Sequence, residues 1–508
     1  MCGFLFQIDG REKLNRERFE KTLSNISWRG PDASDIIYDP CGNALLGHCR
    51  LSVVDPKPRS NQPMRSSCGR YLILFNGEIY NHIYLRKKLS LHCSTGSDTE
   101  TVLAGYKKIG EDIFSMLDGM FAIVIYDNKA SEWVAARDAF GIKPLYFSKH
   151  GEKVLLSSEA SAIAEILSLP PSEESILEWA YVRRPVPGYS YFDGVEEVLP
   201  GTSINSKGFN FRHFKLEPDE SEFDQEKFEE ILIQSVQQHE MSDVTNVSLL
   251  SGGLDSAVIA GISSIEKCYT VGLEHNNEFE GAQETATQIG KSLDFVKVKE
   301  EELVETWRKL VRLRNEPLGV PNEGLIYSVC SQMEKDEKVV LTGEGADEIL
   351  FGYDRIFRWA RGADSLISPE SFIERYGYGE GPIPSRLIEY VSSCQVGKSS
   401  IDFVEDFFLN FHLPGLLRRM DFASMAASKE ARVPFVNKKL ISYMYRRPSA
   451  DRIDDRSSKI PLRRLAAKMD LFGALSRRKV GFSAEIRREG TSTYSHFRSI
   501  VMGELGWC

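Results

Sequence analysis

Short apolar runs separated by Gly, Asp and Asn dominate the first 200 residues of the chain. Runs of this kind are typical of β-strands, and they predict strands at 71–81, 120–128, 131–138 and 153–159. Helical spacing occurs at 16–24 and at 99–109, where a Ser-Asp pair precedes the apolar positions as an N-cap would. Strands with a few interleaved helices predict an α+β unit built as a sandwich of antiparallel sheets.

A different pattern follows an acidic stretch at 216–225, which has few apolar residues and resembles a linker. The spacing predicts a helix over 225–239, and then strands at 246–250, 267–273, 295–299 and 338–343 alternate with helices. This alternation predicts a doubly wound α/β unit, and the remaining C-terminal third is predicted to be largely helical. We therefore expect two domains, at 2–205 and 220–508.

Composition narrows the classes of protein that fit this organisation. The chain has 508 residues, with 63 basic and 73 acidic side chains and a formal net charge of −10, which argues against a nucleic acid as the main partner. It contains no apolar run near the roughly 18–20 residues of a membrane span. Its nine cysteines form no CxxC pair, and its first residues lack the basic start of a secretory signal. We therefore expect a cytoplasmic protein that has neither a nucleic acid nor a membrane as a partner. The oligomeric state that we consider is a homodimer.

The second residue carries the first candidate chemistry. Removal of Met1 would leave Cys2 with a free α-amine, so that one residue supplies both a thiol nucleophile and a base. The pKa of a thiol is about 8.5 and that of an α-amine about 7.7–8.0, so proton transfer between them is feasible near neutrality. A cysteine at this position by chance is the alternative.

Polar motifs beside the predicted strands extend this chemistry. The amide of Asn76 and the backbone N–H of Gly77 are suited to an oxyanion hole. Arg50 can hold a carboxylate through two parallel hydrogen bonds, and Asp98 can pair with an ammonium group. Taken singly, Asn-Gly is more often an ordinary turn, and an exposed Asp is usually solvated.

These motifs together resemble the class II glutamine amidotransferase domain, whose Ntn-hydrolase-type fold is the expected sandwich. The resemblance rests on MCGF, RGPD, HCRLS, FNGEIYN, GSDTE, LDGMFAIVIYD and ARDAFGIKPLYF, which span nearly all of residues 2–160. It implies that Cys2 attacks glutamine to form a thioester and that Asn76 and Gly77 stabilise the oxyanion. It also implies a glutamine-binding set of Arg50, Leu51, Val54, Asn76, Gly77, Glu78 and Asp98. Trp28 departs from the family, which usually has His before RGPD.

A second cluster, LLSGGLDS at 249–256, follows a predicted strand and opens a helix. Its glycines, hydroxyls and helix N-terminus suit phosphate binding, but it lacks the lysine of a Walker A loop. TGEGADE at 342–348 follows another strand, so Asp255 and Asp347 should meet at the carboxyl edge of the sheet, where two carboxylates suit Mg²⁺. The alternative to a metal site is that Asp255 and Asp347 only stabilise the dipoles of the helices at whose N-termini they lie.

SGGLDS, TVGL, LTGEGADE, MAASKEARVPF and KIPLRR, in this order behind the first domain, resemble the synthetase domain of asparagine synthetases of the B type, a PP-loop ATP pyrophosphatase. The resemblance implies that MgATP adenylates a carboxylate, and that ammonia passes from Cys2 through a tunnel and displaces AMP. It implies Glu344 as a base in amidation and Lys459 as the residue that stabilises the adenylation transition state, with Asp255 and Asp347 as the metal site. The implied ATP-binding set is Leu249, Leu250, Ser251, Gly252, Gly253, Asp255, Ser256, Val271, Gly272, Thr342 and Gly343.

Three departures from the family affect the acceptor side. The segment 316–324 replaces an Arg-Ala-Ser-Thr run, Val436-Asn437 replaces an aspartate after RVPF, and Phe351 stands where glycine is usual. Three functions stay open: a glutamine-hydrolysing asparagine synthetase; the same ligase acting on another carboxylate, such as a sugar uronic acid; and a regulatory or glutaminase-only paralogue. A pocket lined by residues 317–326 would favour the second function.

Overall fold

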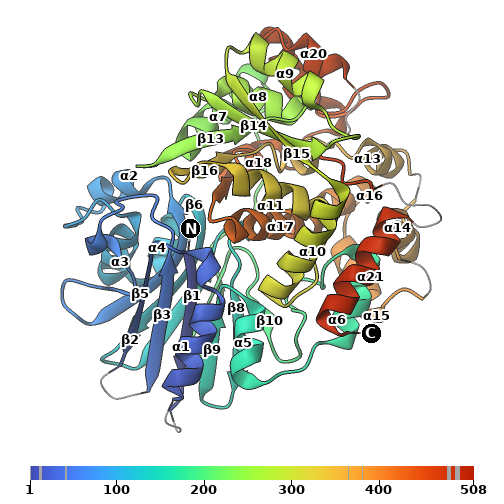
Figure 1. Cartoon of the computed structure of the whole chain (residues 1–508). Coiled ribbons are helices and arrows are strands. Elements are labelled where there is room, and N and C mark those ends of the chain that lie inside the picture. The colour runs from blue at the N-terminus through green and yellow to red at the C-terminus, as the bar shows by residue number, and fades with distance from the viewer. Residues whose placement is uncertain are drawn as a thin grey trace.

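Two six-stranded antiparallel sheets face each other in the first half of the molecule, shown in blue to green-blue below the green and yellow parallel sheet in Figure 1. This computed structural model describes residues 2–10, 14–39, 43–363, 365–379, 382–477, 482–486 and 492–507. The first sheet runs in the order β10 (Glu196–Glu197), β8 (Tyr146–His150), β9 (Lys153–Ser157), β1 (Cys2–Ile8), β3 (Ala44–Arg50) and β2 (Ala33–Tyr38). The second runs in the order β12 (Asn210–Arg212), β11 (Thr202–Asn205), β7 (Glu132–Arg137), β6 (Gly119–Asp127), β5 (Tyr71–Ile79) and β4 (Met64–Arg65).

The core between these sheets follows from the alternation of side chains along the strands. Phe4 and Phe6 of β1 meet Leu74 of β5 and Val124 of β6 in one buried cluster. The outer faces are covered by helices, which gives four layers: α1 (Arg16–Asn25) and α5 (Ala160–Leu167) on the first sheet, and α2 (His82–Lys88), α3 (Asp98–Ile109) and α4 (Ile113–Met116) on the second. The predicted sandwich is confirmed, and its second sheet continues past residue 205 because β12 pairs with β11.

The second half is built on a five-stranded parallel sheet. Its order is β15 (Ser292–Val298), β14 (Lys267–Leu273), β13 (Thr245–Leu249), β16 (Glu337–Leu341) and β17 (Glu430–Arg432). One face is covered by α7 (Gln225–His239), α8 (Leu254–Ile262), α9 (Phe279–Gln288), α18 (Lys438–Met444), α19 (Ile460–Lys468) and α20 (Phe472–Ser476). The other is covered by α10 (Glu300–Arg314), α11 (Glu323–Gln332) and α17 (Leu413–Ala426). Helices on both faces confirm the doubly wound α/β prediction.

The predicted helical part packs beside this sheet. α13 (Asp354–Arg361), α14 (Pro369–Tyr376), α15 (Ser385–Gln395) and α16 (Ser400–Phe407) share an aromatic core, and the remaining helices are α6 (Glu173–Val182), α12 (Ala346–Ile349) and α21 (Thr493–Leu505). No helix in the part of the chain described by the structure is long and apolar enough to cross a bilayer.

Phe351 has a backbone conformation that favours glycine, the residue that the resemblance leads us to expect at this position. Its φ of +58° is left-handed, a conformation that costs a residue with a Cβ roughly 1–2 kcal/mol. Packing compensates, because the buried ring stacks on Phe357 at 4.0 Å and lies 3.6 Å from the guanidinium of Arg452.

We therefore expect Phe351→Ala to lower the free energy of unfolding by about 3–5 kcal/mol, because it empties a core site and keeps the backbone strain. Phe351→Gly should be about 1 kcal/mol more stable than the alanine variant, because glycine adopts this φ without strain. Urea denaturation of the two variants measures the difference. Equal stability of the two variants would contradict the strain argument.

Candidate active site

The pairing of β1 with β3 places Cys2 directly opposite Arg50. The backbone nitrogen of Cys2 donates to Oδ1 of Asn76, 2.9 Å away on β5, so the second sheet positions the start of the first. A cavity of about 30 Å³ opens here, lined by Cys2, Arg50, Leu51, Val54, Gly77, Glu78 and Asp98 among others. The structure thus gathers the predicted glutamine-binding side chains around one space, with Asn76 beside it.

Asn76 keeps one amide donor without an acceptor among the described residues. Its Oδ1 is used by Cys2, whereas its buried Nδ2 has no hydrogen-bond partner among the described residues. A buried amide N–H without a partner is costly unless a ligand accepts from it. At the next residue a Cβ would lie only 2.0 Å from the carbonyl oxygen of Met120, so Gly77 is required for the close approach of β5 and β6.

Burial sets the protonation states around Cys2. Burial raises the pKa of the Cys2 thiol, while the Leu51 N–H and the charge of Arg50 act in the opposite direction. A raised thiol pKa means that attack requires a nearby base. The pKa of Glu78 is also raised well above its ordinary value, by burial first and then by the charge of Asp98.

Arg50 and Asp98 are held rigidly by their own neighbours. The two terminal nitrogens of Arg50 donate to the carbonyls of Lys57, Val54 and Asp55 and to Oδ1 of Asn61, at 2.8–3.1 Å. Binding of a carboxylate through two parallel hydrogen bonds from these nitrogens therefore requires the 54–61 loop to release one hydrogen bond at each nitrogen. Asp98 begins α3 and accepts the Ile79 N–H at 3.0 Å.

The SGG and GEG loops face one cavity of about 210 Å³ in the second half. Ser251 and Ser256 are hydrogen bonded through their hydroxyls at 2.9 Å, and α8 begins directly after Gly253. A Cβ at Gly343 would lie 2.9 Å from the Ser256 nitrogen, so glycine permits the two loops to touch. This arrangement presents a helix N-terminus and hydroxyls to a phosphate-sized space.

Two acids that line this cavity pair with one ammonium group outside its lining. Nζ of Lys459 lies 2.7 Å from both carboxylate oxygens of Asp255 and 2.7 Å from Oδ1 of Asp347. A Cβ at Gly352 would lie 1.9 Å from that oxygen of Asp347, so only glycine fits behind the acid. Glu344 lines the same cavity and accepts from Arg419 at 2.8 Å.

Of the predicted nucleotide set, Leu249, Ser251, Asp255, Ser256, Thr342 and Gly343 line this cavity, together with Glu344 and Asp347. Gly252, Gly253 and Gly272 are not part of its lining, and the side chains of Leu250 and Val271 are buried in the cores on the two faces of the sheet. Asn322 and Ile326, from the segment 317–326 considered as a pocket lining, also line it, whereas sequence reasoning missed Tyr353, Leu416, Arg419 and Met420. The departure at 316–324 was the one signal that pointed to Asn322.

The other departures from the family lie away from the cavity. Asn437 caps α18 by accepting the Lys439 and Leu440 N–H groups at 2.9 and 3.3 Å, so it replaces an aspartate in a role that an amide oxygen can fill. Trp28 packs edge-on against Phe422 of α17 at 5.4 Å. Tryptophan in place of the family's usual histidine therefore changes the contact between the two halves.

Buried charges join the two halves near both cavities. Asp421 on α17 accepts from Arg29 at 2.7 Å and from Lys143 at 3.2 Å, while Arg29 also donates to the Cys2 carbonyl at 3.1 Å. Burial lowers the pKa of Lys143, and the charge of Asp421 opposes that shift. From β17, Glu430 lines the Cys2 cavity.

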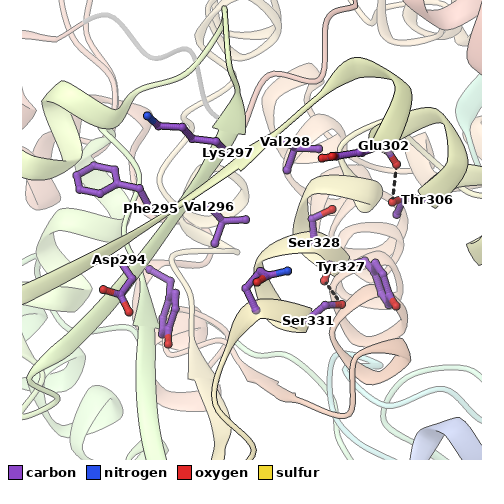
Figure 2. Close-up of a pocket in the computed structure, with 12 residues that line it drawn as sticks. Asp294, Phe295, Val296, Lys297, Val298, Glu302, Thr306, Tyr327, Ser328 and Ser331 are labelled. Atoms are coloured by element: carbon purple, nitrogen blue, oxygen red, sulfur yellow. Dashed lines mark hydrogen bonds between the residues drawn. The ribbon is translucent and has the colours of Figure 1, made fainter.

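A larger open groove, of about 620 Å³, lies at the edge strand β15 (Figure 2). Its lining comes mainly from β15, α10 and α11 and includes Asp294, Val296, Glu302 and Ser328. None of the predicted site residues lines it, so its size does not make it the active site.

Comparisons with known proteins agree with this division of the chain. Residues 1–215 match the model of a glutamine amidotransferase domain, and residues 227–500 match the model of asparagine synthase. The chain belongs to the asparagine synthase family. With that family, it is an ATP-dependent ligase that takes its nitrogen from glutamine.

Individual relatives support the family assignment, although their names differ. Asparagine synthetase [glutamine-hydrolyzing] 3 of Bacillus subtilis (strain 168) is 28% identical over 91% of this chain and 84% of its own length. Asparagine synthetase [glutamine-hydrolyzing] 1 of the same organism is 28% identical over 96% and 87%. A protein named Amidase chry2 from Gibberella zeae is 31% identical over 72% of this chain and 58% of its own length.

Proposed function

We propose that the chain hydrolyses glutamine at Cys2 and transfers the ammonia to a carboxylate that ATP has activated as an acyl-adenylate, with release of AMP and pyrophosphate. The observation that supports this best is the cavity shared by the SGG and GEG loops, whose lining acids Asp255 and Asp347 both pair with Lys459. We also propose two domains, at 2–205 with β12 added and at 220–508.

In the first reaction, the Cys2 thiol would attack the amide carbon of glutamine after loss of Met1. The α-amine accepts the thiol proton and returns it to the leaving nitrogen as the carbon–nitrogen bond breaks. Ammonia departs, and the thioester that remains is hydrolysed by water. Nδ2 of Asn76, which has no partner among the described residues, would donate to the oxyanion. Arg50 and Asp98 would attract the carboxylate and the ammonium group of glutamine.

In the second reaction, the acceptor carboxylate would attack the α-phosphate and displace pyrophosphate. Asp255 and Asp347 fit Mg²⁺, because both already converge on one ammonium group, and the ion takes few protein ligands beside phosphate oxygens. When bound, the ion would neutralise charge on those oxygens. Lys459 would then turn to the phosphates, and Glu344 would accept the proton lost when ammonia attacks the acyl-adenylate.

Two molecules are candidates for the acceptor carboxylate. Aspartate, which would give asparagine, is the first, because the family model and the Bacillus relatives are named for that product. Another carboxylate, such as a sugar uronic acid, is the second. It is favoured by the cavity linings drawn from residues 317–326, which include Gly319, Val320, Asn322 and Ile326.

Incubation with glutamine, MgATP and single acids tests the proposal. Glutamate, AMP and pyrophosphate should appear in equal amounts with the true acceptor, and mass spectrometry should show its amide. Formation of ADP and phosphate in place of AMP and pyrophosphate would contradict the adenylation step. A chain that hydrolyses glutamine but releases no pyrophosphate with any acid would be a glutaminase only.

A further inference from the structure

A second, smaller cavity of about 70 Å³ adjoins the nucleotide cavity. Leu416 and Arg419 of α17 line both spaces, and one loop contributes Gly319 and Val320 to the smaller cavity and Asn322 to the larger. We call the smaller space the side pocket. The side pocket and the nucleotide cavity therefore share part of one wall.

A chain of hydrogen bonds runs from one space to the other. The Tyr376 hydroxyl lies 2.6 Å from Nδ1 of His412, whose Nε2 lies 2.9 Å from the Tyr353 hydroxyl, and that hydroxyl donates to Glu348 at 2.8 Å. Tyr353 lines the nucleotide cavity, whereas Tyr376 and His412 line the side pocket. An imidazole ring and two hydrogen bonds therefore separate the two tyrosine oxygens. This separation is longer than the distance between the two carboxyl groups of aspartate.

The charges in the side pocket are unbalanced. Among the described residues that line it are three arginines and no carboxylate. Arg184 is paired with Glu197 at 3.0 Å and Arg419 with Glu344 at 2.8 Å. His412 adds no positive charge near neutrality, because burial lowers its pKa to about 3.

Arg183 is the arginine for which the described residues show no acid partner. Its guanidinium lies against the stacked rings of Tyr378 and Tyr494, at 5.1 and 4.8 Å from their centroids. Its buried Nε and Nη1 donate to no described residue. Burial lowers the pKa of Arg183, and nearby Arg498 adds to that effect. A desolvated guanidinium with free donors and aromatic walls is suited to an anionic group of a ligand.

We infer, on the basis of the proposed function, that the acceptor is an acid longer than aspartate that carries a second anionic group, which binds Arg183 in the side pocket while the first carboxylate is adenylated beside Glu344. The small volume of the side pocket matches a compact group such as a carboxylate or phosphate. Arg183 is then a specificity residue and takes no part in the bond changes.

Ammonia-dependent pyrophosphate release tests this inference in the full-length protein. The probes are aspartate, glutamate, 2-aminoadipate, galacturonate and galacturonate 1-phosphate. We expect kcat/KM to rise with the longer dianionic acids, and galacturonate 1-phosphate to exceed galacturonate. For the preferred acid, Arg183→Gln should raise KM about tenfold or more with little change in kcat, because a charge-assisted hydrogen bond is lost, and Arg183→Lys should restore part of the binding.

Arg498→Gln is the matched control, because it removes an equal charge near Arg183 from an exposed position outside the lining. Unchanged glutamine hydrolysis shows that each variant is folded. Turnover of aspartate alone, with the same KM in Arg183→Gln, would overturn the inference and leave the proposed ligase in place. Equal effects of the Arg183 and Arg498 variants would also overturn it. Absence of pyrophosphate release with every acid would overturn the proposed function itself.

Discussion

Replacing Cys2 with alanine is expected to abolish glutamine-dependent amide formation and to leave ammonia-dependent formation intact. The nucleophile lies in its own cavity, apart from the space shared by Asp255 and Asp347. Its loss should reduce glutamine hydrolysis by about 10⁴-fold or more, the range seen when a covalent nucleophile is removed. Glutamate release and pyrophosphate release, measured with glutamine and then with ammonium chloride, give the two activities.

Cys49→Ala is the matched control for this experiment. This thiol belongs to β3, the strand paired with β1, and is buried, but it is not part of the lining of the Cys2 cavity. Glutamine hydrolysis should survive in this variant. Loss of the ammonia-dependent reaction in Cys2→Ala would show that the two sites are not separable.

Asp347→Asn should stop pyrophosphate release with either nitrogen source and preserve glutamine hydrolysis. The substitution keeps the shape of the side chain but removes one of the two carboxylates that meet Lys459. A loss of about 100-fold or more is expected, because Asp347 would help to hold the metal ion, whose positive charge on the phosphate oxygens contributes several kcal/mol. The readout is pyrophosphate formed with the preferred acid at saturating ATP.

Asp354→Asn provides the comparison for Asp347→Asn. Asp354 begins α13 nearby and pairs with Arg358 at 2.8 Å, but it does not line the nucleotide cavity. It should retain nearly full activity. If Asp347→Asn released pyrophosphate at the original rate, the assignment of Asp347 to the nucleotide site would be wrong.

Local pattern predicted the elements that build both cavities. The strands expected at 71–81 and 267–273 correspond to β5 and β14, and the Ser97 cap before α3 is present, because apolar alternation and capping depend on neighbouring residues. The short helices α2, α5 and α6 were not predicted, because each spans few turns and lies between strands. The two sequence motifs also predicted that Asp255 and Asp347 lie close together. The structure adds that both acids pair with Lys459.

The side pocket could not be predicted, because no local motif marks it. Arg183 follows α6, Val320 precedes α11, and Tyr376 ends α14, so segments far apart in the chain form it. A single arginine in a sequence is normally an exposed residue, and only the fold shows that its donors are buried without an acid. Arg419 was missed for the same reason, since its partner Glu344 lies 75 residues away.

One continuous piece of backbone serves both reactions. On α17, Leu416 and Arg419 line the nucleotide cavity, and Asp421 pairs with Arg29. On β17, which follows α17, Glu430 lines the cavity of Cys2. Thermodynamic linkage then imposes a symmetry on the enzyme. If a bound adenylate raises the affinity for glutamine by some factor, glutamine must raise the affinity for the adenylate by the same factor. A variant such as Asp421→Asn that changes this coupling factor must therefore change it equally when it is measured from either ligand.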